Sequence, residues 1–280
     1  MDTLRMYAAN NRGSITNAVY VVVFLVALYY LYKFLVAGSD LEVNVLDVEV
    51  DANAPQSFPL PDSPRVRVKS GGEYTLSFWM YVNTWDYRAG LAKSVLQIVD
   101  SADKSSSLLT TILYPNESKM MIRVKTEGTQ GGTSYNNYSN FDALLSGSQG
   151  AAMFSPSVET PMCDLVDVDL QRWINVTISV NGRIVDVFYD GKLARSCVLP
   201  EIPVAPTTGR QAITIGAKGG FGGKISGVQF FAYTLTPDRI YSIYQAGPRG
   251  AAGFLGYLTE KLGIKLTYSG AGGQQKGFVV

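Results

Sequence analysis

The chain has 280 residues, a formal net charge of +1 and no histidine. The lack of histidine excludes Ser-His-Asp and Cys-His catalytic groups and removes the commonest zinc ligand. Basic and acidic residues balance, and no long basic run occurs, so we expect no nucleic-acid partner.

The chain opens with a polar segment, residues 1–13, followed by a predicted transmembrane helix, residues 14–37. Ser14–Tyr32 has no charged residue, and at about 1.5 Å per residue it nearly crosses a hydrocarbon core of about 30 Å. A cleaved signal peptide is the alternative, but the polar lead and the length of the apolar run favour a retained anchor. The anchor residues include Ala18, Val22, Phe24, Leu28 and Tyr32.

The flanking charges predict how this anchor is oriented. Arg5 and Arg12 precede it, whereas acidic residues dominate the segment that follows. Because positively charged flanks tend to stay in the cytoplasm, we expect a cytoplasmic N-terminus and the large domain on the other side of the membrane.

Residues 38–64 are predicted to be a juxtamembrane strand and a proline-rich linker. Leu41–Asp51 alternates apolar and polar residues, which is typical of a strand, and Ala54–Pro64 has four prolines, which is typical of a stiff spacer. The spacing of Asp47, Glu49 and Asp51 resembles that of glucanase carboxylates. We interpret these residues as the solvated face of the strand and expect no enzyme.

The clearest pattern in the chain lies at Gln171–Leu193. Apolar residues alternate with polar ones along Ile174–Val180, as in a half-buried strand. Asn181-Gly182 supplies a tight hairpin turn, and Asp190-Gly191 turns the chain again after a second strand. Two consecutive hairpins predict an antiparallel β architecture.

Other segments extend this pattern. Tyr74–Val82 is predicted to be a core strand, two Gly-containing strands follow at Ile213–Gly216 and Phe221–Ile225, and Thr236–Gly247 has the signals of a short helix. In this order the segments resemble concanavalin A-like domains of the laminin G and pentraxin type. The resemblance implies an all-β fold: an antiparallel β-sandwich, a concanavalin A-like jelly roll over residues 65–247, behind the single N-terminal transmembrane helix.

Many domains of this type bind calcium through clustered aspartates, so we considered metal ligands. The candidates are Asp164, Asp167 and Asp169, because oxygen ligands suit Ca²⁺. Turn chemistry explains aspartates in loops more simply. We therefore expect no cofactor.

Loop residues give candidates for surface interactions. Trp85, Tyr87, Tyr135 and Tyr138 lie in predicted loops, where exposed aromatic rings could stack on sugars or pack on a protein neighbour. Of these, Trp85, Tyr135 and Tyr138 are the candidate interaction residues. Trp79 and Trp173 are interpreted as residues of the sandwich core or its edge. Glycosylation sequons begin at Asn116 and Asn137 in predicted loops; a third begins at Asn175, which we interpret as an outward polar residue of a strand.

Two cysteines, Cys163 and Cys197, bracket the predicted hairpins. A disulfide between them would contribute roughly 4 kcal/mol in the chain-entropy model, and two buried thiols are the alternative. The motifs Pro161–Cys163, Gln171–Val176 and Asp190–Pro200 resemble membrane-anchored virion proteins of large nucleocytoplasmic DNA viruses, such as those infecting algae. That resemblance favours pairing of the cysteines.

The same resemblance implies a structural function. It predicts a minor capsid protein at the interface of internal membrane and capsid in the virion, linking that membrane to the icosahedral shell, with the lipid bilayer and other capsid proteins as partners. Assembly of a shell on the cytosolic face would oppose the predicted orientation of the anchor. The alternative is a membrane-anchored carbohydrate-binding or adhesion module, with carbohydrate as its partner. In the capsid reading, the Gly-rich tail, residues 248–280, with its apolar stretch Phe254–Tyr268, is expected to contact capsid neighbours.

Overall fold

The computed structural model describes residues 17, 20–30, 41–101, 107–127, 163–206 and 209–248. The chain divides into two compact units, Met1–Asp40 and Leu41–Val280. The predicted polar segment, the region 128–150 with Tyr135, Asn137 and Tyr138, and the tail from residue 249 onward lie outside the described residues.

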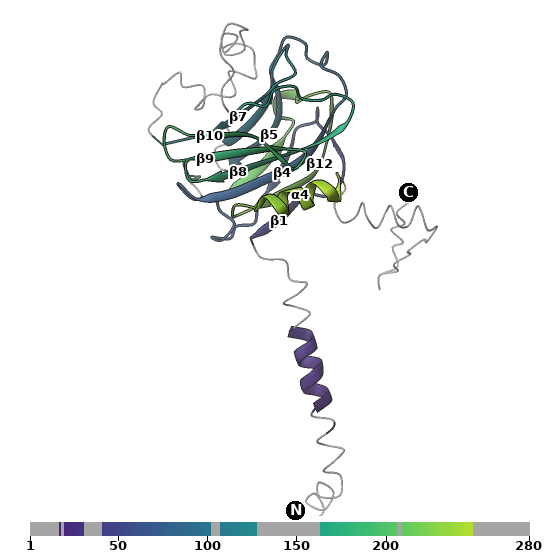
Figure 1. Ribbon diagram of the computed structural model, residues 1–280, viewed down its shortest axis with the longest axis vertical. Helices are drawn as coiled ribbons and strands as arrows, with labels where there is room; N and C mark the ends of the chain where they lie inside the picture. Colours follow the sequence, from purple (N-terminus) through teal and green to yellow (C-terminus); the bar gives the residue numbers. More distant parts are fainter. Residues whose placement is uncertain are drawn as a thin grey trace, which may run out of the picture. The chain divides into compact units, whose positions relative to one another are not determined.

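The first unit contains a helix over residues 20–30 (Figure 1, purple). Its side chains are exposed; Val22, Phe24 and Leu28 are 58%, 63% and 44% exposed. Within the described part of the chain, no helix has both the length and the apolar character needed to cross a membrane. Ala18, Tyr32 and most other flanking positions of the predicted 14–37 span lie outside the described residues. The transmembrane helix therefore stays a prediction.

The second unit is a sandwich of two antiparallel sheets (Figure 1). In the described residues the seven-stranded sheet has the order β1-β12-β4-β8-β9-β10, with β2 also beside β12, and the five-stranded sheet has the order β3-β11-β5-β6-β7. The predicted antiparallel β-sandwich is confirmed. The strands are β1 Glu42–Leu46, β2 Val50–Asp51, β3 Gln56–Pro59, β4 Glu73–Val82, β5 Lys93–Asp100, β6 Ser107–Leu113, β7 Met120–Val124, β8 Trp173–Asn181, β9 Ile184–Tyr189, β10 Lys192–Val198, β11 Gln211–Ile215 and β12 Gly223–Phe231.

The predicted hairpins form the centre and one edge of the seven-stranded sheet. β8 pairs with β9, and β9 pairs with β10. Gly182 has φ +56°, while Asp190 and Gly191 have φ +49° and +74°, so both turns use the left-handed backbone that their residues tolerate. These hairpins are confirmed, as is the core strand at Tyr74–Val82.

The segment 38–64 differs from the prediction, because most of it belongs to the sandwich. β1 and β2 pair with β12 in one sheet, and β3 pairs with β11 at the edge of the other. Pro59 is tolerated in β3 because an edge strand leaves one row of backbone groups unpaired. The alternating strand was therefore correct, but its position outside the domain was not: the sandwich begins near Leu41 rather than at residue 65.

The two late strands also separate from each other. β11 lies in the five-stranded sheet and β12 in the seven-stranded sheet, so they are joined in sequence but not by backbone pairing. The apolar faces of both sheets meet between the layers, where Leu76, Phe78, Ile98 and Ile213 are fully buried. This burial of apolar surface is the main stabilising term of the unit.

The helix α4, Pro237–Ala246, lies against the outer face of the seven-stranded sheet (Figure 1). Ile240 packs with Phe231 and Phe188, and the ring of Tyr244 stacks on Trp79 with centroids 5.8 Å apart. Asn175, expected to be an outward polar residue, does point away from the core but is fully buried on this covered face. Its amide lies 3.3 Å from the Ser77 hydroxyl.

Candidate functional site

A pocket of about 710 Å³ opens on the outer face of the seven-stranded sheet. It combines three aromatic rings with amide, hydroxyl and charged side chains and with two glycines. The lining residues are Tyr81, Tyr87, Trp173, Asn53, Asn83, Thr84, Glu49, Asp51, Lys224, Gly222 and Gly223.

Four of these residues form a row across adjacent strands. Lys224 of β12 is paired with Asp51 of β2 on one side and with Tyr81 of β4 on the other. Tyr81 is in turn paired with Trp173 of β8. Because paired residues of antiparallel strands project to the same face, the four side chains share one surface, which spans three strand spacings of about 4.8 Å each. We call Asp51, Lys224, Tyr81 and Trp173 the cross-strand row.

The row faces outward because its neighbours face the core. Met80, Ile174 and Ile225 alternate with row residues and are fully buried. The rings of Tyr81 and Trp173 lie with centroids 5.7 Å apart and planes at 59°. The two rings are neighbours at one end of the row, and the charged residues lie at its other end.

The charged end holds two carboxylates and one ammonium group. Lys224 Nζ lies 3.1 Å from Glu49 Oε2, which makes an ion pair. Asp51 stands directly opposite Lys224 in the strand ladder and is exposed. Glu49 and Asp51 belong to the segment that the sequence placed near the membrane, outside the domain.

Glycines at the start of β12 let three chain segments approach one another. A Cβ atom on Gly222 would lie 2.8 Å from Tyr87 Cβ, and one on Gly223 would lie 2.0 Å from the Tyr81 carbonyl oxygen. Any larger residue at these positions would force β12 away from β4 and from the segment that carries Tyr87. Tyr87 is also held by its hydroxyl, which donates to the Gly219 carbonyl at 3.0 Å.

Trp85 lies in the same loop as Tyr87 but does not line the pocket. It is half-buried against the core, and the ammonium group of Lys93 lies 5.3 Å from its ring centroid. Lys93 Nζ donates to the Pro115 carbonyl at 3.1 Å. Burial lowers the pKa of Lys93. Trp85, predicted as an interaction residue, thus contributes to anchoring the loop that carries Thr84 and Tyr87.

A cluster of polar residues fixes the strand that carries Trp173. Arg172 forms ion pairs with Asp169 and, at 2.7 Å, with Asp190. The other Asp190 oxygen accepts a hydrogen bond of 2.9 Å from the Asn175 backbone. Tyr189 donates to Asp169 at 2.9 Å. The sequence motifs around Trp173 and Asp190 are therefore joined in space through Arg172.

The pKa values of Asp169 and Tyr189 are shifted in this cluster. The hydrogen bond from Arg172 lowers the pKa of Asp169. Burial raises the pKa of Tyr189 to about 12. With these shifts, Asp169 stays ionised and Tyr189 stays a neutral hydrogen-bond donor throughout the physiological pH range.

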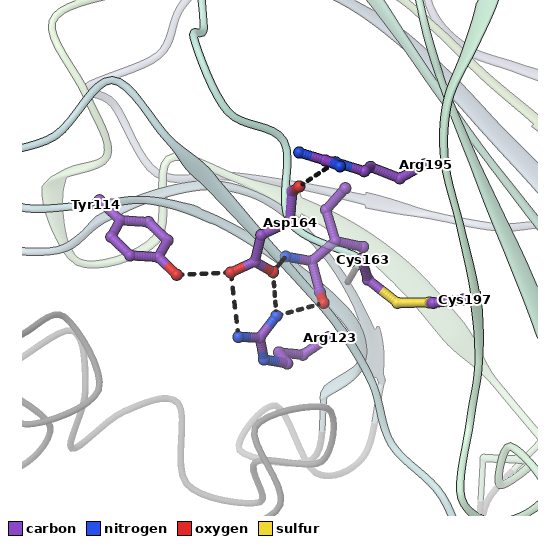
Figure 2. A network of polar contacts seen from close by, with 7 residues as sticks. Tyr114, Arg123, Cys163, Asp164, Arg195 and Cys197 are labelled. Atoms are coloured by element: carbon purple, nitrogen blue, oxygen red, sulfur yellow. Dashed lines mark hydrogen bonds and ion pairs between the residues drawn. A yellow bond between two sulfur atoms is a disulfide. The ribbon is translucent and has the colours of Figure 1, made fainter. Parts of the chain in front are cut away.

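The calcium candidates do not converge on a common point. Asp164 is fully buried and forms an ion pair with Arg123, which is 1% exposed, while the hydroxyl of Tyr114 donates to it at 2.6 Å (Figure 2). Asp169 pairs with Arg172, and Asp167 is in a left-handed turn. Among the described residues, no group of three or more acidic or cysteine side chains could hold a metal ion.

Cys163 and Cys197 form a disulfide, with Cα atoms 5.6 Å apart (Figure 2). It ties the segment before β8 to the edge strand β10, next to the buried Arg123–Asp164 pair. Arg195 adds a hydrogen bond of 3.2 Å to the Asp164 carbonyl. Of the sequons, Asn116 is exposed in the turn between β6 and β7, whereas Asn175 is buried and hydrogen-bonded.

The composition of the pocket suits a ligand with both apolar faces and many hydroxyl groups. Aromatic rings offer flat apolar surfaces, amide groups both donate and accept hydrogen bonds, and carboxylates accept them. Sequence reasoning indicated Tyr87 as a possible sugar-contacting aromatic residue of a loop. It missed the pocket itself, because the residues of the cross-strand row come from four strands whose pairing is set by the whole fold. One sequence feature could have indicated the pocket: the family-like Gly-Gly-Lys at 222–224. Its two glycines contact the segments of Tyr87 and Tyr81, and Lys224 follows them directly.

Together, the two antiparallel sheets, the covering helix and the outward pocket define a β-sandwich module of the concanavalin A type. The family described as the "Concanavalin A-like lectin/glucanases superfamily" matches residues 56–241, and the chain belongs to this superfamily. The match begins after Glu49 and Asp51, so the carboxylate end of the pocket lies outside the matched segment.

Solved structures with a similar arrangement have low sequence identity. The botulinum neurotoxin serotype D binding domain matches with TM-score 0.46 and 10% identity, covering 71% of this chain and 42% of that chain. The botulinum neurotoxin DC binding domain in complex with SialylT has TM-score 0.45 and 12% identity, over 71% and 41%. A Trypanosoma rangeli sialidase has TM-score 0.42 and 10% identity, over 73% and 27%.

This chain thus spans about two fifths of the toxin binding domains and about a quarter of the sialidase. With TM-scores below 0.5, these likenesses say nothing about a shared ligand. In a comparison with curated protein sequences, none matches the chain.

Proposed function

We propose that this chain is a non-enzymatic carbohydrate-binding module. The observation that supports it is the pocket on the outer sheet face, where the rings of Tyr81 and Trp173 adjoin Asn83 and the charged end of the cross-strand row. Ligand sites typically combine such apolar surfaces with a few placed polar groups. A sugar ring would stack on the aromatic end, and its hydroxyl groups would bond to the amide and carboxylate oxygens.

The proposal excludes glycoside hydrolysis for a chemical reason. Hydrolysis needs a carboxylic acid kept protonated by its surroundings and a second carboxylate across the scissile bond. Glu49 instead contacts the ammonium group of Lys224, and Asp51 is exposed to water. Incubation of the chain with β-glucans and other glycans should release no reducing sugar; release abolished by Asp51→Asn would contradict a non-enzymatic function.

We further propose that residues 14–37 anchor the module in a membrane. In its support, the apolar side chains of residues 20–30 are exposed in a helix, which is unfavourable in water and favourable in lipid. Flotation of the full chain with lipid vesicles, compared with a chain lacking residues 1–40, tests the anchor. Equal flotation of the two would contradict it.

A second candidate function is the capsid tether implied by the sequence resemblance. One observation favours a protein contact: Ile184, Leu193 and Val198, on the β9–β10 edge hairpin, are 46%, 57% and 63% exposed. Exposed apolar residues of this kind often mark protein interfaces. A tether should remain with the capsid after detergent removes lipid, whereas a free lectin-like module should be released.

Glycan binding by the full chain in detergent micelles tests the main proposal. We expect glycans on an array to bind, and we expect Trp173→Ala to weaken the affinity at least tenfold, about 1.4 kcal/mol, because the sugar loses its stacking surface. The matched control is Tyr241→Ala, an aromatic residue that is 44% exposed on α4 and outside the pocket. Equal loss in both variants, or no binding by the wild type, would contradict the proposal.

A further inference from the structure

We infer that the pocket is selective for uncharged glycans and disfavours glycans that carry carboxylate or sulfate groups. The inference rests on the proposed carbohydrate-binding function and specifies its ligand class. It follows from the charges at one end of the cross-strand row and from how they are paired.

The charged residues that line the pocket are Glu49, Asp51 and Lys224. Two carboxylates and one ammonium group leave one net negative charge. The ammonium group is the natural partner of an acidic sugar, but it already forms an ion pair of 3.1 Å with Glu49. An acidic ligand that reached this half-exposed ammonium group would place a third negative charge beside Glu49 and Asp51.

A second cation, on the residue before Trp173, is also paired with carboxylates. Arg172 precedes Trp173 in the chain and holds the carboxylates of Asp169 and Asp190. Its guanidinium group further lies 5.8 Å from the ring centroid of Tyr189. An anionic sugar stacked on Trp173 would therefore find this positive charge compensated by two aspartates.

Neutral sugars meet the opposite situation. Their hydroxyl groups are hydrogen-bond donors, and hydrogen bonds to ionised carboxylates are stronger than those between neutral groups. The row runs from Asp51 to Trp173 over three strand spacings, about 14 Å in all. A glycan lying across the strands would stack on Tyr81 and Trp173 while its hydroxyl groups donate to Asp51 and Glu49.

The two pocket carboxylates, Glu49 and Asp51, lie outside the segment that matches the family. The family match covers residues 56–241, and Glu49 and Asp51 precede it on the β2 side of the sheet. The same sandwich without these residues would keep the aromatic end of the row and Lys224. Its pocket would then carry a net positive charge and favour acidic glycans. The short β2 region therefore changes the preference of the site from acidic to uncharged glycans.

The test uses the full chain in detergent micelles on an array where each neutral glycan is printed beside its sialylated, uronic or sulfated counterpart. We expect neutral members to bind at least tenfold more tightly at low salt. Asp51→Asn should reduce this difference in affinity between neutral and acidic glycans, the gap. Raising the salt concentration should also reduce it, because both changes weaken the repulsion between the pocket carboxylates and an acidic glycan. Asp47→Asn is the matched control: it removes an exposed carboxylate from the same segment outside the pocket and should leave the gap unchanged.

The outcomes separate the inference from the proposed function. Tight binding of acidic glycans, or a gap that Asp51→Asn does not change, would overturn the charge selectivity while leaving carbohydrate binding intact. Failure of every glycan to bind would overturn both. Binding of neutral glycans with a gap that closes in Asp51→Asn but not in Asp47→Asn is the result that the structure supports.

Discussion

At the scale of single residues, the buried pair of Arg123 and Asp164 has the largest predicted effect on stability. Both side chains are almost completely removed from water, and Tyr114 completes the contacts of the carboxylate. Burial, together with the neighbouring carboxylate, raises the pKa of Tyr114, so its hydroxyl stays a hydrogen-bond donor. Asp164, one of the three calcium candidates, is thus paired with the guanidinium group of Arg123 instead of a metal ion.

We predict that Asp164→Asn lowers the free energy of unfolding by about 3–5 kcal/mol, because it leaves a buried guanidinium charge without its counter-ion. Urea unfolding followed by tryptophan fluorescence measures the change. The double variant Arg123→Leu/Asp164→Leu should lose less than Asp164→Asn, since it leaves no unpaired charge. Arg239→Gln, which breaks an exposed pair with Glu42, is the control and should change stability by less than about 1 kcal/mol. A loss in Asp164→Asn no larger than in this control would contradict the account.

Asp169 gives a prediction for acid stability. Its pKa lies below the ordinary value of 3.8, mainly because Arg172 donates to it. Between the folded and unfolded pKa values the unfolded chain binds more protons, so the stabilisation is present above pH 3.8 and is lost as the pH falls through the lowered value. We expect thermal melts from pH 6 to pH 2 to show a steeper acid loss in the wild type than in Asp169→Asn. Parallel curves would contradict this role.

At the scale of elements, the disulfide between the segment before β8 and the strand β10 closes a loop with a sequence separation of 34. In the chain-entropy model, such a cross-link contributes up to about 4 kcal/mol by restricting the unfolded chain. We predict that Cys163→Ser/Cys197→Ser lowers the unfolding free energy by up to this amount in urea titrations.

A reducing agent supplies the control for this prediction. It should lower the stability of the wild type to that of the double serine variant and leave the variant itself unchanged. Wild-type stability that is the same in oxidising and reducing buffer, with free thiols shown by alkylation, would contradict a stabilising role for the disulfide.

The elements also show which parts of the fold local sequence determines. The hairpins of β8, β9 and β10 were predictable because alternation and the turn residues Asn181-Gly182 and Asp190-Gly191 act over a few positions. The strand at Leu41–Asp51 was visible as an alternation, but its pairing with β12 is made across most of the chain length. Local pattern predicts that a strand exists, whereas its neighbours depend on the register of the whole sheet.

The candidate site illustrates the same limit. Trp173 and the Gly-Gly-Lys sequence at 222–224 were recognised as family-like features, yet nothing local indicated that Trp173, Tyr81 and Lys224 project side by side. Asn175 shows the converse, because its outward position was predicted while its complete burial was not. Both differences arise from packing between segments that are distant in sequence.

At the scale of the whole molecule, the two proposed functions, membrane anchoring and glycan binding, fall in different units of the chain. The proposed anchor lies in Met1–Asp40, and the pocket lies entirely in Leu41–Val280. The domain incorporates β1 and β2 beyond the family match, and β2 brings the carboxylates to the pocket. The same short region therefore follows the proposed anchor in the sequence and supplies carboxylates to the pocket.

The most direct test of the central claim is a crystal structure of the chain with a glycan identified on the array. The account predicts a sugar ring stacked against Trp173 and Tyr81, with hydroxyl groups within hydrogen-bond distance of Asp51 or Glu49. A glycan bound elsewhere, such as on the β9–β10 hairpin, with the pocket left to solvent, would contradict the assignment of this site.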